Sequence, residues 1–290
     1  MTKEKYAFED KLLTIIDPEV GLSFEEAFDP VLLPASFSGN EVLDHGCRLR
    51  IITDDASNPI EACVEKEGVR HGQTRLFFSD GSTKAEAYYN RGMLHGPSTF
   101  YHDDGITLAQ SWYLHGQIQG KCWQYYADEA PYSIGRFKDN LPHGIQEYYY
   151  PDGTPKTALP YMKGKLHGTA QLYHHNGKKA REITFVDGQR QGPERTWDHS
   201  GTLIIEAEHQ GTRLVGMSRR WHSNSILAEE ILYDDENPNK FNVKQWNVDG
   251  ILLREGVYDH NNHYHHTVYN VDGDIIEKRQ GFWDGQALRL

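Results

Sequence analysis

Residues 92–116 read GMLHGPSTFYHDDGITLAQSWYLHG, and this stretch carries the pattern that decides the fold. Counting from Gly96, an aromatic residue follows five positions later (Tyr101), a glycine nine later (Gly105) and a second aromatic residue seventeen later (Tyr113). The pattern returns every 24 residues, with its first glycine at 72, 96, 120, 144, 168, 192 and 216. We call this glycine position 0 of each repeat. Self-similarity at a fixed period indicates a repeat architecture.

Each repeat predicts one β-hairpin. The first strand runs from position 0 to an x-[DN]-G turn such as DDG at 103–105, whose glycine supplies the positive φ that a tight turn demands. A second strand follows, and a GxxxG segment leads into the next hairpin. Because side chains alternate between the faces of a strand, positions 3 and 5 share one face, and positions 4 and 6 share the other. On the second strand, positions 13, 15 and 17 share a face, where small residues stand beside one large ring. We expect the aromatic residues at positions 5 and 17 to pack inside the fold.

The pattern predicts an all-β solenoid of stacked antiparallel hairpins over residues 44–290, with about ten repeats that are degenerate at both ends. Residues 1–43 stand outside it and are acidic. The stretch KYAFEDKLLTIID (5–17) predicts an amphipathic helix that Asp17-Pro18 ends, and SFEEAF (23–28) predicts a second short helix with Ser23 as its N-cap. We interpret this segment as a partly helical cap on the end of the sheet; the alternative is an acidic arm that engages a basic partner.

The repeat resembles the MORN repeat (membrane occupation and recognition nexus), in the bacterial variant of the form GxxxGxxxxYxxxGxxxxxxxYxxG. Gly92, Gly96, Tyr101, Gly105 and Tyr113 carry the resemblance, as do the matching positions of the following repeats. It covers residues 44–290. The resemblance implies a scaffold, a membrane-associated module or, in the bacterial variant, an antitoxin or immunity protein that neutralises a toxin.

Composition excludes several other classes. The 290 residues carry a formal net charge of −12, whereas a nucleic-acid-binding face is basic. No segment approaches the roughly 18 apolar residues of a membrane span, and the N-terminus has no apolar signal region. Three scattered cysteines provide neither a disulfide framework nor a zinc site. We expect a reduced, cytoplasmic protein with no strong membrane binding; its oligomeric state stays open.

No motif predicts a catalytic residue, a cofactor or a metal site. Histidines precede the position-0 glycine in five repeats, but hairpins stacked about 10 Å apart hold such rings too far apart to share an ion. Carboxylate pairs such as Asp103-Asp104 lie in turns, where Asp is wanted for backbone reasons. The histidine-rich run 259–266, including His260–His266, leaves open a concealed metal site and hence an enzyme.

The sequence instead favours protein binding. Aromatic and imidazole side chains recur at position 6 and extend to positions 4 and 16, with glutamates at position 14 along the edge, which is the composition of a protein interface. The predicted partner-binding residues are Phe78, Tyr88, Phe100, His102, Trp112, Tyr126, Tyr148, Tyr150, His174 and His222. The alternative is that this face packs on the N-terminal segment or on the array itself. The leading hypothesis is a non-enzymatic antitoxin or immunity protein that occludes a toxin, for which the acidic charge suits a basic partner; the second is a scaffold or membrane-peripheral protein.

Overall fold

The computed structural model describes residues 8–9, 12–27, 30–36, 41–237, 240–259, 263–283 and 288–289. The chain forms two compact units. Unit 1 comprises Met1–Pro155 with Tyr161–Gly164, and unit 2 comprises Lys156–Pro160 with Lys165–Leu290. The segment before the repeats therefore belongs to the same unit as the first repeats.

Strands account for nearly all regular structure. The first fourteen are β1 (Phe8–Glu9), β2 (Leu12–Asp17), β3 (Leu22–Ala27), β4 (Arg48–Thr53), β5 (Pro59–Lys66), β6 (Val69–Phe77), β7 (Thr83–Asn90), β8 (Met93–Tyr101), β9 (Thr107–Leu114), β10 (Gln117–Ile118), β11 (Gly120–Tyr125), β12 (Pro131–Lys138), β13 (Leu141–Pro142) and β14 (Gly144–Tyr149). The others are β15 (Pro155–Met162), β16 (Lys165–Leu166), β17 (Gly168–Tyr173), β18 (Lys179–Val186), β19 (Gln189–Trp197), β20 (Leu203–Gln210), β21 (Arg213–Trp221), β22 (Leu227–Tyr233), β23 (Phe241–Trp246), β24 (Leu252–Tyr258), β25 (His263–Tyr269), β26 (Ile275–Trp283) and β27 (Leu288–Arg289). In the described part of the chain, one 3-10 turn at Asp44–Gly46 is the sole helical element.

The predicted antiparallel hairpins are confirmed in both units. In unit 1, β8 and β9 pair from Gly96 opposite Tyr113 to Phe100 opposite Ala109, and a bulge follows before Tyr101. At the turn, the His102 backbone N–H donates to the carbonyl of Ile106 (2.8 Å), and Gly105 has a φ of +84°. A side chain at that φ is strained, which is why glycine recurs there.

The pairing assigns each repeat position to a face. Positions 2, 4, 13, 15 and 17 lie on one face, which we call the hollow face. Positions 1, 3, 14 and 16 lie on the other face, which we call the hairpin face because the N-terminal hairpin described below lies on it. The rings at position 5 lie on this face too, and Phe77 packs there against the buried cluster around Leu49 and Val64. Tyr149, also at position 5, is buried. Side chains at equal positions therefore form rows that run across the strands.

The N-terminal segment corrects the predicted helices. Residues 12–17 and 22–27 are the strands β2 and β3, which pair from Leu12 opposite Ala27 to Asp17 opposite Leu22. Asp17-Pro18 forms the hairpin turn rather than a helix end, and Gly21 takes a φ of +66°. Ser23 is inside β3 and caps no helix. The run Thr14-Ile15-Ile16 is β-branched, which favours a strand once a sheet is available to pack against.

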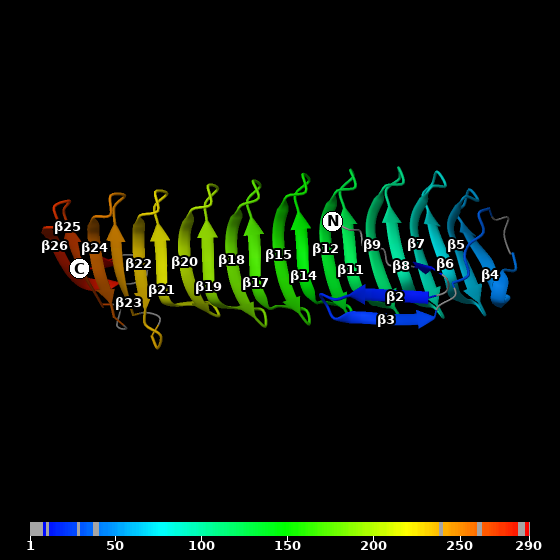
Figure 1. Ribbon diagram of the computed structural model, residues 1–290, viewed down its shortest axis with the longest axis horizontal. Coiled ribbons are helices and arrows are strands. Elements are labelled where there is room, and N and C mark those ends of the chain that lie inside the picture. The colour runs from blue at the N-terminus through cyan, green and yellow to red at the C-terminus, as the bar shows by residue number, and fades with distance from the viewer. Residues whose placement is uncertain are drawn as a thin grey trace. The chain divides into compact units, whose positions relative to one another are not determined.

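This N-terminal hairpin lies across the strands of unit 1, on the hairpin face (Figure 1). Ile15 is fully buried against Trp112, with Tyr88 beside them. Farther along the chain, the carbonyl of Val31 accepts a hydrogen bond from the Gln73 backbone N–H (2.9 Å). The segment therefore covers a face of the sheet.

A buried arginine fixes the hairpin turn. The Arg136 guanidinium donates to Glu19 of the turn (3.0 Å), to Glu147 (2.9 Å) and to the carbonyl of Ile145 (2.7 Å). Asp17 is fully buried nearby, and burial raises its pKa from 3.8 against the opposing influence of Lys121 and Arg136. The hairpin is thus held by apolar packing and by charge-assisted hydrogen bonds.

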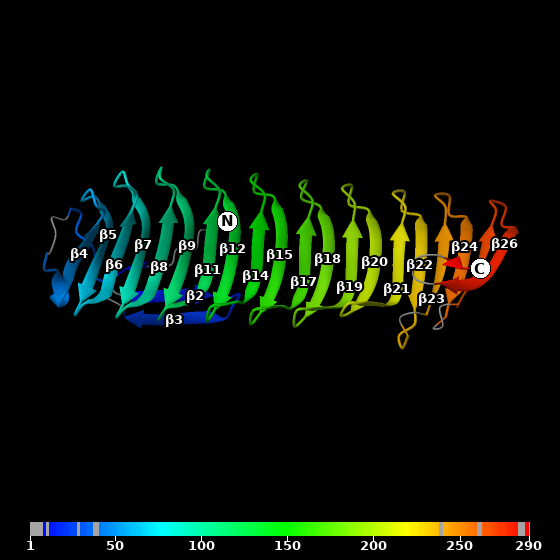
Figure 2. The ribbon, with the colours of Figure 1, turned by 180° about the vertical axis from the view of Figure 1, so that it is seen from behind.

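Unit 2 continues the hairpins from β17 to β26, each strand beside the next (Figure 2). Its last repeats lack glycine at position 0. Phe241 stands there instead and lies opposite Tyr233 on one side and Tyr258 on the other. Its ring stacks on Tyr258 with centroids 4.4 Å apart, and Tyr258 stacks on Tyr264 of the next repeat (5.9 Å). Cross-strand ring contacts replace the close backbone approach that the glycine allows.

Candidate protein-binding surface

The structure separates the predicted binding residues into three groups. Trp112 and Tyr88, both at position 16, lie on the hairpin face beneath Ile15. Trp112 is 3% exposed. In this structure they pack the N-terminal hairpin against the sheet, as the alternative interpretation of the sequence stated. We therefore do not include them in the surface proposed below.

The second group stands at position 6, where each residue begins a turn. At three of these positions, the polar tip of the ring reaches the backbone of the next repeat. The Tyr126 hydroxyl donates to the carbonyl of Tyr149 (2.9 Å), and the His174 and His222 rings lie 2.9 and 3.0 Å from the carbonyls of Trp197 and Trp246. Where the residue is Asp198, its carboxylate instead accepts from the backbone of its own turn. The rings of Tyr126, His174 and His222 therefore connect adjacent hairpins. Phe78, His102 and Tyr150 occupy the same place in their own turns.

The third group, Phe100 and Tyr148 at position 4, lies on the hollow face of unit 1. Beside them this face contains a hollow of about 240 Å³, which is lined by Tyr148 and by Ala109, the residue opposite Phe100. Small or polar residues of successive repeats line part of it: Ala109 and Ser133 at position 13, Ser111 and Gly135 at position 15, and Cys122 and Gln146 at position 2. Larger apolar residues complete the lining, among them Ile118, Trp123 and Phe137. Position 15 holds Leu159 and Ile183 in the following repeats. The hollow therefore exists because Ser111 and Gly135 leave room that larger side chains fill elsewhere.

Aromatic rings stand around this hollow. Phe100 is 44% exposed and lies opposite Ala109. On the other side, Tyr148 meets Tyr132 edge-on with centroids 6.2 Å apart, and Tyr132 meets Tyr126 at 5.3 Å. Tyr132, which sequence reasoning missed, is itself exposed and sits at the bulge of its hairpin. An apolar recess with exposed rings at its edge can accept an apolar side chain from another protein.

The hollow contains no activated nucleophile. Burial raises the pKa of the Cys122 thiol to about 11, so that it is protonated at neutral pH. The Gln146 side chain is fully engaged, since it accepts from the Arg136 backbone N–H (3.0 Å) and donates to the Arg136 carbonyl (2.8 Å). The neighbouring Ser133 hydroxyl donates to Gln124 (3.0 Å). These groups rigidify the lining and offer binding rather than bond-breaking chemistry.

Within the described ranges, no group of three or more His, Cys, Asp or Glu side chains lies close enough together to hold a metal ion. His95 is buried and meets His115 edge-on at 4.9 Å. Of the histidine-rich run, residues 260–262 lie outside the described ranges, while His265 and His266 are on opposite faces of β25. Over the same described ranges, no helix has both the length and the apolar character needed to cross a membrane.

Residues 142–163 and 166–187 match the family described as MORN repeat variant. This match supports the MORN-repeat family, whose repeats are in general modules of protein or membrane interaction rather than enzymes. No curated protein matches the chain.

Two solved structures show distant similarity to this chain. One is the crystal structure of TcdB2-TccC3, at 11% identity and a TM-score of 0.20, aligned over 95% of this chain and 16% of that chain. Another is the Photorhabdus luminescens Tc holotoxin pore with the mutation TccC3-D651A, at 12% identity and a TM-score of 0.21, over 96% of this chain and 14% of that chain. The chain thus spans less than a fifth of the length of these structures.

Proposed function

We propose that this protein is a non-enzymatic protein-binding repeat protein, and that the hollow face of unit 1 is its binding surface. The observation that carries the proposal is the hollow beside Phe100 and Tyr148 on the face opposite the N-terminal hairpin. Because the hairpin covers the other face, the exposed rings of unit 1 are concentrated on this one. A partner's apolar side chain in the hollow, surrounded by these rings, provides the dry, central anchor that dominates protein interfaces.

Within this class, we propose that the partner is a toxin, and that the chain acts as a bacterial antitoxin or immunity protein. Support comes from the resemblance of the repeat to the bacterial MORN variant and from the net charge of −12, which accelerates encounter with a basic protein. Neutralisation would be steric: the sheet covers the rim of the partner's active site, and no covalent step is required.

A substitution that fills the hollow tests the binding surface. Ser111→Leu places at position 15 the residue that Leu159 already provides two repeats later, so the fold should tolerate it. The matched control is Ala87→Leu, at the same repeat position but outside the hollow. Tagged wild-type protein is purified from its native cells, co-eluting proteins are identified, and each candidate is expressed alone and with the chain.

We expect one stoichiometric partner that is toxic alone and harmless when co-expressed with wild type or Ala87→Leu. Ser111→Leu should lose the partner while melting at the wild-type temperature. Binding that is unchanged in Ser111→Leu would contradict the hollow-face proposal. A non-toxic partner would contradict the antitoxin assignment alone, and firm flotation of the protein with anionic liposomes would favour the membrane-peripheral alternative.

A further inference from the structure

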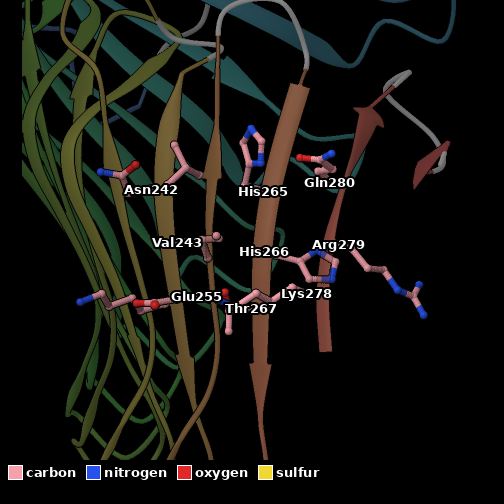
Figure 3. A pocket seen from close by; sticks show the side chains of 12 residues that line it. Asn242, Val243, Glu255, His265, His266, Thr267, Lys278, Arg279 and Gln280 are labelled. Atoms are coloured by element: carbon pink, nitrogen blue, oxygen red, sulfur yellow. The ribbon is translucent and has the colours of Figure 1, made fainter. Parts of the chain in front are cut away.

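Unit 2 carries a groove on its hairpin face, between strands β23 and β26. It encloses about 590 Å³. Two rows of side chains form its walls, with the backbone of position 2 and position 15 residues such as Gly256 as its floor. One wall is the row of positions 1 and 16, formed by Asn242, Val257, His265 and Gln280. The other wall is the row of positions 3 and 14, formed by Lys244, Glu255, Thr267 and Lys278. Figure 3 shows His265 and Thr267 on one side of β25 and His266 on the other.

These are the rows that the N-terminal hairpin occupies in unit 1. There, Gln73 stands at position 1, and Trp112 and Arg136 stand at position 16. The hairpin crosses the strands along this row, places Ile15 on the apolar residue and offers Glu19 to the basic one. Unit 1 therefore demonstrates that these rows of the repeat form a seat for an acidic two-stranded hairpin laid across the sheet.

The same chemistry is present around the groove of unit 2. Leu232 and Val257, at position 16 of consecutive repeats, are 44% and 46% exposed. Beside them, Lys244 and Lys278 form no ion pair within the described residues. Lys244 lies opposite two glutamates, Glu230 and Glu255. Glu230 pairs with Arg219 (2.9 Å), and Glu255 accepts a hydrogen bond from the Tyr269 hydroxyl (2.6 Å). The groove thus offers exposed aliphatic surface and two exposed lysines, while both glutamates beside Lys244 already have partners; this matches the apolar and acidic character of the hairpin seated in unit 1.

We propose that this groove is a second docking site, separate from the hollow face, and that its occupant is an acidic β-hairpin of another protein. The occupant would lie across β22–β25 with an aliphatic residue over Leu232 and Val257 and a carboxylate toward Lys244 or Lys278. Its apolar contacts provide most of the affinity, and the carboxylates fix its register on the sheet. The site does not depend on the partner of the hollow face.

Charge reversal tests this site. The probe is a backbone-cyclised 14-residue hairpin with two isoleucines on one face and four glutamates at its edges, and a second probe carries four lysines instead. Fluorescence anisotropy measures the binding of each probe to the full-length chain and to Lys244→Glu/Lys278→Glu. The matched control is Lys163→Glu/Lys165→Glu, which makes the same charge change at exposed residues away from the groove.

The wild type and the control should prefer the acidic probe by about tenfold or more, and Lys244→Glu/Lys278→Glu should prefer the lysine probe. A benzoylphenylalanine in place of Val257 should crosslink the bound probe, whereas one in place of Trp112 should not. Equal affinity for both probes, absence of binding at about 1 mM, or crosslinking at position 112 alone would overturn the proposal. So would a dimer of the unliganded chain that Lys244→Glu/Lys278→Glu dissociates, since a second copy would then be the occupant.

Discussion

Two adjacent isoleucines in β2 give a sharp test of how the N-terminal hairpin is seated. Ile15 is 0% exposed and packs on Trp112, whereas Ile16 is 55% exposed. Replacing Ile15 by Ala removes three carbons from a fully buried site. At about 0.8 kcal/mol per carbon, the lost transfer free energy is about 2.4 kcal/mol, and the cavity left above Trp112 adds to it. We therefore expect Ile15→Ala to lower the free energy that holds the N-terminal hairpin on the sheet by about 2–4 kcal/mol. Ile16→Ala should lower it by less than about 0.5 kcal/mol.

Native-state hydrogen exchange locates the loss as well as measuring it. In Ile15→Ala, the free energy of opening of the backbone amides in β2 and β3 should fall by the same amount, about 2–4 kcal/mol, while the amides of β19 and β20 in unit 2 should retain wild-type protection. The Ile16→Ala variant is the matched control, because it makes the same chemical change one residue away on the opposite side of the strand. A larger effect for Ile16→Ala would mean that β2 is seated one residue out of register, and equal small effects would mean that the hairpin is not docked.

Three further substitutions test other parts of the structure. Tyr149→Ala should lower the free energy of urea unfolding by about 3–5 kcal/mol, because its ring is buried at position 5; a change below about 1 kcal/mol would contradict this packing. Asp17→Asn should stabilise the protein at pH 7 and not below about pH 3.8. Burial raises the pKa of Asp17 in the folded state, so the protonated Asp17 favours folding below pH 3.8, and this stabilisation is lost as the pH rises through the pKa of the folded state. A constant difference between the two proteins across this range would contradict the assignment. Glu194→Gln should cost about 1–3 kcal/mol in thermal unfolding, because the buried Glu194 carboxylate accepts from Arg181 (2.8 Å) and lies 3.0 Å from His209; an unchanged melting temperature would mean that this network contributes nothing.

The repeat register could be read from sequence because it depends on local requirements that recur. The turn glycines, such as Gly105, are needed for their positive φ, and the alternation of side chains fixes which positions share a face. Where the period fails, prediction fails too. The apolar residues of 5–17 fit a helical period and a strand pattern equally well, and only the sheet beneath them selects the strand. The helix predicted there was wrong because Ile15 finds its partner, Trp112, about a hundred residues away.

The binding residues were harder to predict for a related reason. Composition identified rings at positions 4, 6 and 16 as one surface, but the two faces and the turns divide them. Trp112 could not be recognised as covered without knowing where a non-repeating segment lies. Small residues stand at positions 13 and 15 beside the ring at position 17 in several repeats, so this pattern by itself does not indicate a hollow. The available signal for the hollow was the difference in side-chain size at position 15. This position is small in Ser111 and Gly135 and large in Leu159 and Ile183.

Departures from the repeat are therefore where binding specificity should be sought. A residue required by the hairpin recurs in most repeats, so it offers similar chemistry in each of them and cannot select one site. Gly135 creates a recess in one place, Arg136 secures one hairpin turn, and Lys244 supplies a cation beside one groove. None of the three is dictated by the period. The repeat supplies two faces with fixed rows, and single substitutions within those rows determine what each stretch of either face can hold.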